Sequence, residues 1–103
     1  MLGITFKENC PDVRNTKIVD VITALQDYGI IVDVFDPWAS PEEVMHEYQI
    51  ITTRSLPLQK YAAIVLGVAH SQFLELDLSE VRNEKSLLYD VKGVLKMEVD
   101  GKL

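Results

Sequence analysis

The sequence predicts an α/β fold, a three-layer Rossmann-like open sheet with mostly parallel strands and helices on both faces. Short apolar runs alternate along the chain with segments of helical periodicity. Some runs, such as residues 30–35, are β-branched on both faces, which is typical of strands buried within a parallel sheet. The links are short, as in right-handed strand–helix–strand crossovers.

The first elements follow directly from local patterns. Residues 2–6 are expected to form the first strand. Residues 16–28 are expected to form a helix, because their apolar side chains recur at helical spacing and Gly29 follows in the usual C-terminal position. Residues 30–35 then supply a strand buried on both faces.

The second helix has a clear start signal. Ser40 is an N-cap candidate, Pro41 suits the first helical position, and Glu43 completes a capping box. After it we expect a weak strand, a strong buried strand, a short helix and a last strand, at residues 50–53, 61–68, 70–76 and 86–91.

Composition limits the function. The 103 residues suit a single domain, residues 1–103, and the net charge of −6 argues against general nucleic-acid binding. One cysteine allows no internal disulfide, and no apolar run is long enough to span a membrane. With no signal-peptide pattern at the start, we expect a cytoplasmic protein. Because the chain opens in the second half of a strand, we also expect it to be a piece of a longer protein.

Ligands of such sheets bind beyond the carboxyl ends of the strands. The loops expected there are residues 7–15, 36–40 and 69–72, with a fourth at residues 90–93. In the first loop, Lys7 ends a strand and Arg14 precedes a helix, which suits an anion. The same two cations could instead form surface pairs with the nearby acids Glu8 and Asp12. No complete dinucleotide-binding glycine motif and no P-loop is present.

Catalytic candidates are few. Cys10 has no histidine close in sequence, and a plain loop cysteine is the simpler interpretation. His46 is expected on the surface of a helix and His70 at the start of one, and neither has a carboxylate partner at recognisable spacing. Asp36 is expected to serve the turn that follows it rather than a ligand, and Trp38 suggests an exposed interface residue.

The stretch GITFKENCPDVRNTKIVDVITALQDYGIIVDVFDP resembles the opening of the C-terminal domain of the UDP-glucose/GDP-mannose dehydrogenase family. The family pattern is Gly-x-x-Phe-Lys, a loop with Asp-x-Arg, a helix, and a strand ending in Tyr-Asp-Pro. AIVLGVAHSQF and YDVKGVL are similar to later family segments, so the resemblance covers nearly the whole chain. The matching positions, in order, are Gly3, Phe6, Lys7, Asp12, Arg14, Asp36 and Pro37.

The first loop departs from the common family pattern. Where the family has Thr-Asp-Asp before x-Arg, this chain has Cys10, Pro11 and Asp12, and residues 16–17 are Thr-Lys rather than Ser-Pro. KENCPDVRN resembles the branch that oxidises UDP-N-acetylhexosamines for bacterial surface polysaccharides.

The resemblance implies an NAD-dependent nucleotide-sugar 6-dehydrogenase that turns a sugar C6 alcohol into a carboxylate. It assigns Phe6, Lys7 and, on a weaker match, Lys92 to the UDP-sugar, and Arg14 to NAD bound mainly by an N-terminal Rossmann domain. That domain and a central helix would precede this chain in a homodimer. The catalytic cysteine would lie there too, so Cys10 is not the nucleophile, and we expect this chain alone to be inactive.

A non-enzymatic α/β module is the alternative. It would be a free-standing nucleotide-binding domain or a receiver-like signalling domain. A receiver needs paired acids after its first strand, whereas the first loop here begins with Lys7 and has no adjacent acid pair.

Overall fold

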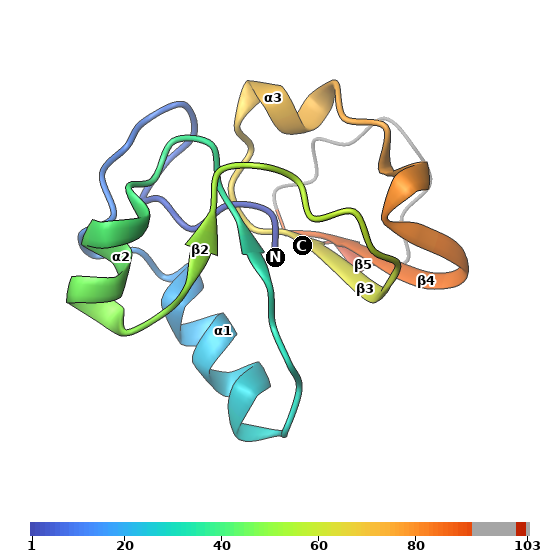
Figure 1. Ribbon diagram of the computed structural model, residues 1–103, viewed down its shortest axis with the longest axis horizontal. Helices are drawn as coiled ribbons and strands as arrows, with labels where there is room; N and C mark the ends of the chain where they lie inside the picture. Colours follow the sequence, from blue (N-terminus) through green and yellow to red (C-terminus); the bar gives the residue numbers. More distant parts are fainter. Residues whose placement is uncertain (92–100, 103) are drawn as a thin grey trace.

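A computed structural model describes residues 1–91 and 101–102. Helices and parallel strands alternate along the chain, as an α/β fold requires (Figure 1). The elements are α1 (Ile18–Asp27), β1 (Val34–Phe35), α2 (Pro41–Tyr48), β2 (Thr52–Thr53), β3 (Tyr61–Leu66), α3 (Ser71–Leu74), the 3-10 helix η1 (Leu78–Glu80), β4 (Arg82–Asp90) and β5 (Gly101–Lys102).

Leu2 joins two parallel half-sheets. One half pairs β1 with β2, and the other has the order β3-β4-β5. Between them Leu2 forms parallel bridges to Phe35 of β1 and Leu66 of β3. Its N–H donates to Val65 (2.8 Å), and its carbonyl accepts from Gly67 (2.9 Å). The order across the molecule is therefore β2, β1, Leu2, β3, β4, β5.

The strand predicted at residues 2–6 is shorter than expected, since only Leu2 forms ladder bridges. Gly3 has a φ of +94°, which turns the chain out of the strand. The next two N–H groups, of Ile4 and Thr5, donate to the carboxylate of Asp36.

The other strand boundaries also differ from prediction. The run at residues 30–35 is a strand only at Val34–Phe35, and Ile31 is 92% exposed, so burial on both faces was wrong for its first part. The predicted strand at residues 50–53 is only Thr52–Thr53. The last predicted strand begins earlier, at Arg82, and β5 follows it without having been predicted.

Hydrophobic side chains pack on both faces of the sheet. Val34 belongs to a cluster with Ile18 and Ile22 of α1 and Val44 of α2. Phe35, the next residue of β1, lies on the opposite face of the sheet. It belongs to a second cluster with side chains of β3, β4, α3 and η1, namely Ile64, Leu66, Leu88, Phe73 and Leu78. This two-sided core, with helices and parallel strands, confirms the predicted α/β class.

The second helix starts as predicted. The Ser40 hydroxyl accepts from the N–H of Glu43 (3.3 Å), and Pro41 is the first helical residue. The Ser40 hydroxyl in turn donates to the Glu42 carboxylate (3.0 Å), so the carboxylate that contacts the cap side chain is that of Glu42 rather than that of Glu43.

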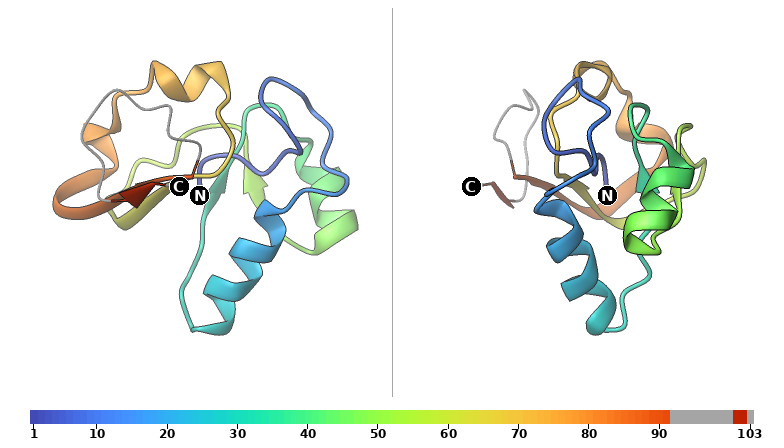
Figure 2. Two further views of the ribbon diagram at one scale, coloured as in Figure 1. Left: turned by 180° about the vertical axis from the view of Figure 1, so that it is seen from behind. Right: turned by 90° about the vertical axis from the view of Figure 1, so that its left-hand side faces the viewer.

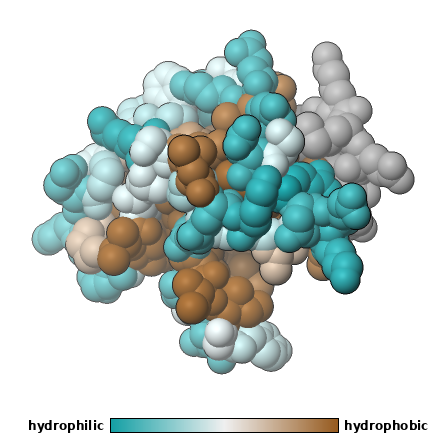
Figure 3. All heavy atoms as spheres, turned by 45° about the vertical axis from the view of Figure 1, so that its right-hand side comes forward, coloured by the Kyte–Doolittle hydropathy of each residue, from teal (hydrophilic) through white to brown (hydrophobic). Residues whose placement is uncertain are grey.

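The loops after Leu2, β1 and β3 rise on one side of the sheet, in both the front and back views (Figures 1 and 2). On the face drawn in Figure 3, hydrophobic side chains form separate patches between hydrophilic ones. None of the helices in the described part of the chain is long and apolar enough to cross a membrane.

Candidate functional site

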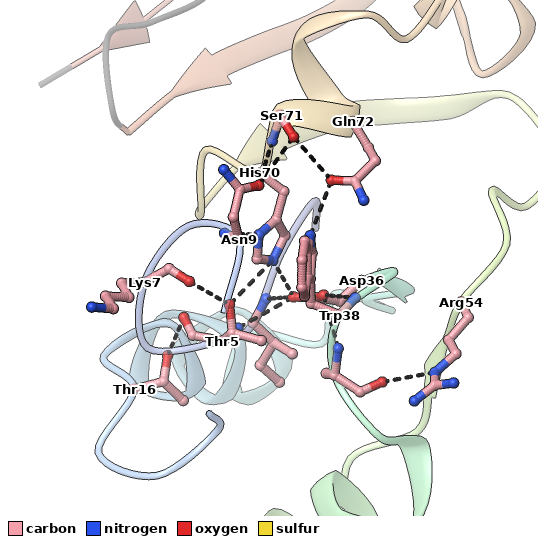
Figure 4. Close-up of polar contacts among 12 residues, drawn as sticks. Thr5, Lys7, Asn9, Thr16, Asp36, Trp38, Arg54, His70, Ser71 and Gln72 are labelled. Carbon is pink, nitrogen blue, oxygen red and sulfur yellow. Dashed lines mark hydrogen bonds and ion pairs between the residues drawn. The ribbon is translucent and has the colours of Figure 1, made fainter. Parts of the chain in front are cut away.

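Three loops meet at the carboxyl edge of the sheet around three buried polar side chains (Figure 4). Thr5 comes from the first loop, Asp36 from the end of β1 and His70 from the segment between β3 and α3. All three are 0% exposed. The sequence placed these loops at one edge, and the structure confirms this.

Asp36 holds the loops together through both carboxylate oxygens. Oδ2 accepts from the N–H groups of Ile4 (2.8 Å) and Thr5 (3.3 Å), which turn away from the sheet. Oδ1 accepts from the N–H groups of Trp38 (2.7 Å) and Ala39 (3.1 Å), which open the loop to α2. The predicted turn-forming role of Asp36 is therefore correct.

Burial alone would raise the pKa of Asp36. The hydrogen bond from His70 and those from the N–H groups of Ile4 and Trp38 outweigh it and lower the pKa below its ordinary value. Asp36 is therefore a buried carboxylate that stays ionised at neutral pH.

His70 uses both ring nitrogens. Nδ1 accepts from the backbone N–H of Asn9 (2.8 Å), so the hydrogen of the neutral ring is on Nε2. Nε2 lies 3.0 Å from Asp36 Oδ2 and 3.1 Å from Thr5 Oγ1. No sequence pattern pairs this histidine with a carboxylate, because the two residues are 34 positions apart and meet where β1 and β3 end, on either side of Leu2.

The Thr–His–Asp grouping is not a catalytic triad. In a triad the histidine contacts the nucleophile with one nitrogen and the acid with the other. Here Thr5 and Asp36 share Nε2 of His70, and the Thr5 hydroxyl donates to the carbonyl of Lys7 (3.0 Å). The cluster holds backbone in place rather than activating a nucleophile.

Asn9 ties the first loop to α3, a role that the sequence analysis missed. Its backbone has a φ of +55°, a conformation that asparagine tolerates better than most residues. Its side-chain Oδ1 accepts from the N–H (2.9 Å) and the hydroxyl (3.1 Å) of Ser71. The sequence feature that pointed to this role was an asparagine within a charged loop, because asparagine side chains often bond to backbone groups in turns.

Phe6 and Lys7 lie between these anchors and are exposed. The Phe6 side chain is 55% exposed, while its N–H donates to the carbonyl of Asp12 (2.7 Å). The Lys7 side chain points away from the buried cluster (Figure 4). The backbone is therefore fixed while both side chains face outward.

A pocket of about 220 Å³ lies beside Phe6. Its lining comes from the first loop, the start of α1 and the ends of β3 and β4, namely Thr5, Phe6, Thr16, Lys17, Ile18, Val21, Gly67, Val68 and Val91. Lys7 is not part of this lining. The pocket combines an aromatic ring with one ammonium group, the chemistry that suits an anionic ligand with an apolar part.

Arg14 is paired in the structure. Its Nε and Nη2 donate to the Asp12 carboxylate at 3.0 and 3.3 Å, and the arginine side chain is 76% exposed. These hydrogen bonds lower the pKa of Asp12 and raise that of Arg14. The surface-pair alternative thus describes the resting contact of Arg14, while Lys7 forms no ion pair within the described residues.

The remaining candidates contribute little to the site. Cys10 is a half-buried free thiol, and His46 lies exposed on α2. Within residues 1–91 and 101–102, no group of histidine, cysteine or acidic side chains could hold a metal ion. Lys92, the third substrate-binding candidate, lies outside the described residues.

Comparison with known proteins agrees with the sequence resemblance. Residues 1–97 match the family model described as "UDP-glucose/GDP-mannose dehydrogenase family, UDP binding domain". Two proteins named UDP-N-acetyl-D-glucosamine 6-dehydrogenase are similar to the chain, at 46% identity (Salmonella typhi) and 47% (Pseudomonas aeruginosa). Protein CapL of Staphylococcus aureus is 31% identical. These matches cover 95%, 92% and 95% of this chain, which spans only about a quarter of each relative (24%, 23% and 24%).

Proposed function

Because the chain belongs to the UDP-glucose/GDP-mannose dehydrogenase family and matches its UDP-binding domain, we propose that it binds the UDP part of a UDP-sugar. The observation that supports this most is the first loop, whose backbone is anchored at Thr5 and Asn9 while Phe6 and Lys7 are presented outward. A rigid loop lowers the entropy cost of ordering its side chains on a ligand.

We propose a role for each candidate residue. The Lys7 ammonium binds diphosphate oxygens, and the Phe6 ring packs against an apolar part of the ligand beside the pocket. Lys92 follows Val91, which lines the same pocket, so its place in the sequence is compatible with a second phosphate contact.

The longer protein is proposed to be an NAD-dependent UDP-sugar 6-dehydrogenase. Its substrate would be a UDP-N-acetylhexosamine, since the relatives at 46% and 47% identity bear that activity in their names. Two NAD molecules would each accept one hydride in two successive oxidations of the C6 alcohol, and water would supply the second oxygen of the carboxylate. We propose that a preceding Rossmann domain holds NAD and that a central helix takes part in forming a homodimer. We also propose that the protein is cytoplasmic and that its product enters polysaccharide synthesis.

Arg14 is the residue of this chain proposed to reach NAD. Its guanidinium is exposed and already makes a two-point contact with the Asp12 carboxylate. A phosphate offers the same pair of acceptor oxygens, so the residue has the chemistry that a diphosphate needs.

Substitution of Lys7 tests the UDP site. Lys7→Ala should weaken UDP binding to this chain about ten- to a hundredfold in a calorimetric titration, the effect of losing one charge-assisted contact. Lys85→Ala is the matched control, because it removes the same charge from an exposed position on β4. Equal UDP affinities for the two variants, with unchanged circular dichroism, would show that Lys7 does not bind the nucleotide.

A further inference from the structure

We propose that His70 is the positioning residue of the UDP-binding loop, residues 5–9, and that it holds this loop only while its ring is neutral. The proposal deepens the UDP-binding function and rests on it. His70 itself is fully buried and is not expected to touch the nucleotide.

The loop is fixed to His70 at both of its ends. At the far end, the Asn9 N–H donates to Nδ1 (2.8 Å). At the near end, Thr5 Oγ1 lies 3.1 Å from Nε2 and donates to the Lys7 carbonyl (3.0 Å). One imidazole therefore sets the backbone on both sides of Phe6 and Lys7.

The ring has little freedom to move. It packs between the side chains of Trp38 and Phe73, with ring centroids 6.1 and 5.3 Å away. Nε2 is also held by Asp36 Oδ2 at 3.0 Å. A ring fixed in this way makes the position of the Asn9 N–H depend on the protonation state of Nδ1.

Protonation would reverse the contact with Asn9. Nδ1 can accept from a backbone N–H only while it carries no hydrogen. On a protonated ring, two N–H groups would face each other, and the far end of the loop would have to leave. Asp36, at the end of β1, is the charged group that contacts the ring among the described residues. Its attraction favours the protonated ring without restoring the bond to Asn9.

The other neighbours of the ring do not titrate near neutral pH. From the first loop it meets the Thr5 hydroxyl and the Asn9 N–H, from the segment before α2 the Trp38 indole, and from α3 the Phe73 ring. Protonation of the imidazole is therefore the event that should release the loop.

Two amide substitutions separate the two nitrogens. In His70→Asn the amide oxygen can take the place of Nδ1 and accept from Asn9. In His70→Gln the amide nitrogen can take the place of Nε2 and donate to Asp36, but the acceptor for Asn9 is lost. At pH 7.5, His70→Gln should bind UDP about three- to tenfold more weakly than wild type, the effect of one lost anchoring bond. His70→Asn should stay within about twofold of wild type, because the Thr5 N–H still donates to the Asp36 carboxylate and holds the near end of the loop.

The pH profile adds a readout that a purely structural role would not change. Between pH 7.5 and pH 5.5 the wild type should lose UDP affinity more steeply than His70→Asn. The His70→Asn profile contains only the titration of UDP itself and of groups elsewhere. Equal slopes would overturn the proposal.

A ligand-free measurement keeps the inference separate from the UDP-binding proposal. In wild type at pH 7.5, nuclear magnetic resonance should detect a coupling through the hydrogen bond between the Asn9 amide nitrogen and His70 Nδ1. This coupling should disappear on acidification. Because the measurement uses only the wild-type chain, it tests the role of His70 even if a variant fails to fold. Its absence at pH 7.5, its persistence at pH 5.5, or wild-type UDP affinity in His70→Gln would each refute the role of His70. A wild-type chain that shows the coupling but does not bind UDP would refute the UDP site instead.

Discussion

Replacing the Asp36 carboxylate with an amide should strongly destabilise the domain. The two side chains have nearly the same shape, so Asp36→Asn tests hydrogen bonding rather than packing. The carboxylate accepts from five N–H groups, three on Oδ2 and two on Oδ1. An asparagine offers one accepting oxygen, and its NH₂ group would face N–H donors on the other side.

The expected loss follows from the smaller set of contacts. With the amide oxygen in the place of Oδ2, the N–H groups of Trp38 and Ala39 lose their acceptor. Hydrogen bonds to a charged group contribute about 1.5–3 kcal/mol each, so two lost bonds should lower the free energy of unfolding by about 3–6 kcal/mol. At about 4 °C or more per kcal/mol for a domain of this size, Tm should fall by at least about 12 °C.

The assay is urea denaturation followed by circular dichroism, with Asp20→Asn as the control. Asp20 is exposed in the first turn of α1, where losing the charge should cost at most about 1 kcal/mol. The reasoning fails if the two variants are equally stable.

The pH dependence has a definite sign. Because folding lowers the pKa of Asp36 from its ordinary 3.8, the full contribution of Asp36 to the free energy of unfolding is present well above pH 3.8. It is lost as the pH falls through the lower, folded-state pKa. The stability gap between wild type and Asp36→Asn should therefore narrow below about pH 4.

Two further predictions concern the glycine turns and the proposed NAD contact. Gly3→Ala should destabilise the domain more than Gly29→Ala in the same denaturation assay. Both glycines have a positive φ (+94° and +83°), which costs an alanine about 1–2 kcal/mol. Of the two positions, only at Gly3 would the new Cβ lie 2.7 Å from Val68 Cβ, and this clash adds about 1–3 kcal/mol. Equal losses would mean that Val68 moves aside freely. In the proposed full-length dehydrogenase, Arg14→Ala should raise the KM for NAD much more than the KM for the UDP-sugar. Arg14→Lys should restore the KM for NAD only in part, because the two-point contact is lost. A rise confined to the UDP-sugar would place Arg14 on the substrate side.

The sequence predicted the fold class because its strongest signals are local. The helical periodicity before Gly29 and the cap at Ser40 describe contacts between near neighbours, and both correspond to helices in the structure. The strand limits were harder to predict, because they depend on partners. Residues 30–33 have strand-like composition but no ladder, and Ile4 and Thr5 leave the sheet for the Asp36 carboxylate.

The buried part of the site could not be predicted for the same reason. Asp36, His70 and Asn9 meet through contacts that span 34 and 61 positions, and no spacing rule connects them. The outward-facing Lys7 could be nominated from its charge and its place after a strand, whereas Phe6 was nominated through the family resemblance. Sequence patterns thus indicated what the loop presents but not what holds it.

The bridging position of Leu2 has a consequence for how this domain folds. Its two bridge partners, Phe35 and Leu66, are 33 and 64 positions away. The strand pairing at the centre of the sheet therefore depends on contacts between residues far apart in the sequence. Closing such long loops costs entropy before any pairing is gained. We therefore expect the β1–β2 and β3–β4–β5 units to assemble first, with the insertion of the first residues as the late step that makes them one cooperative domain.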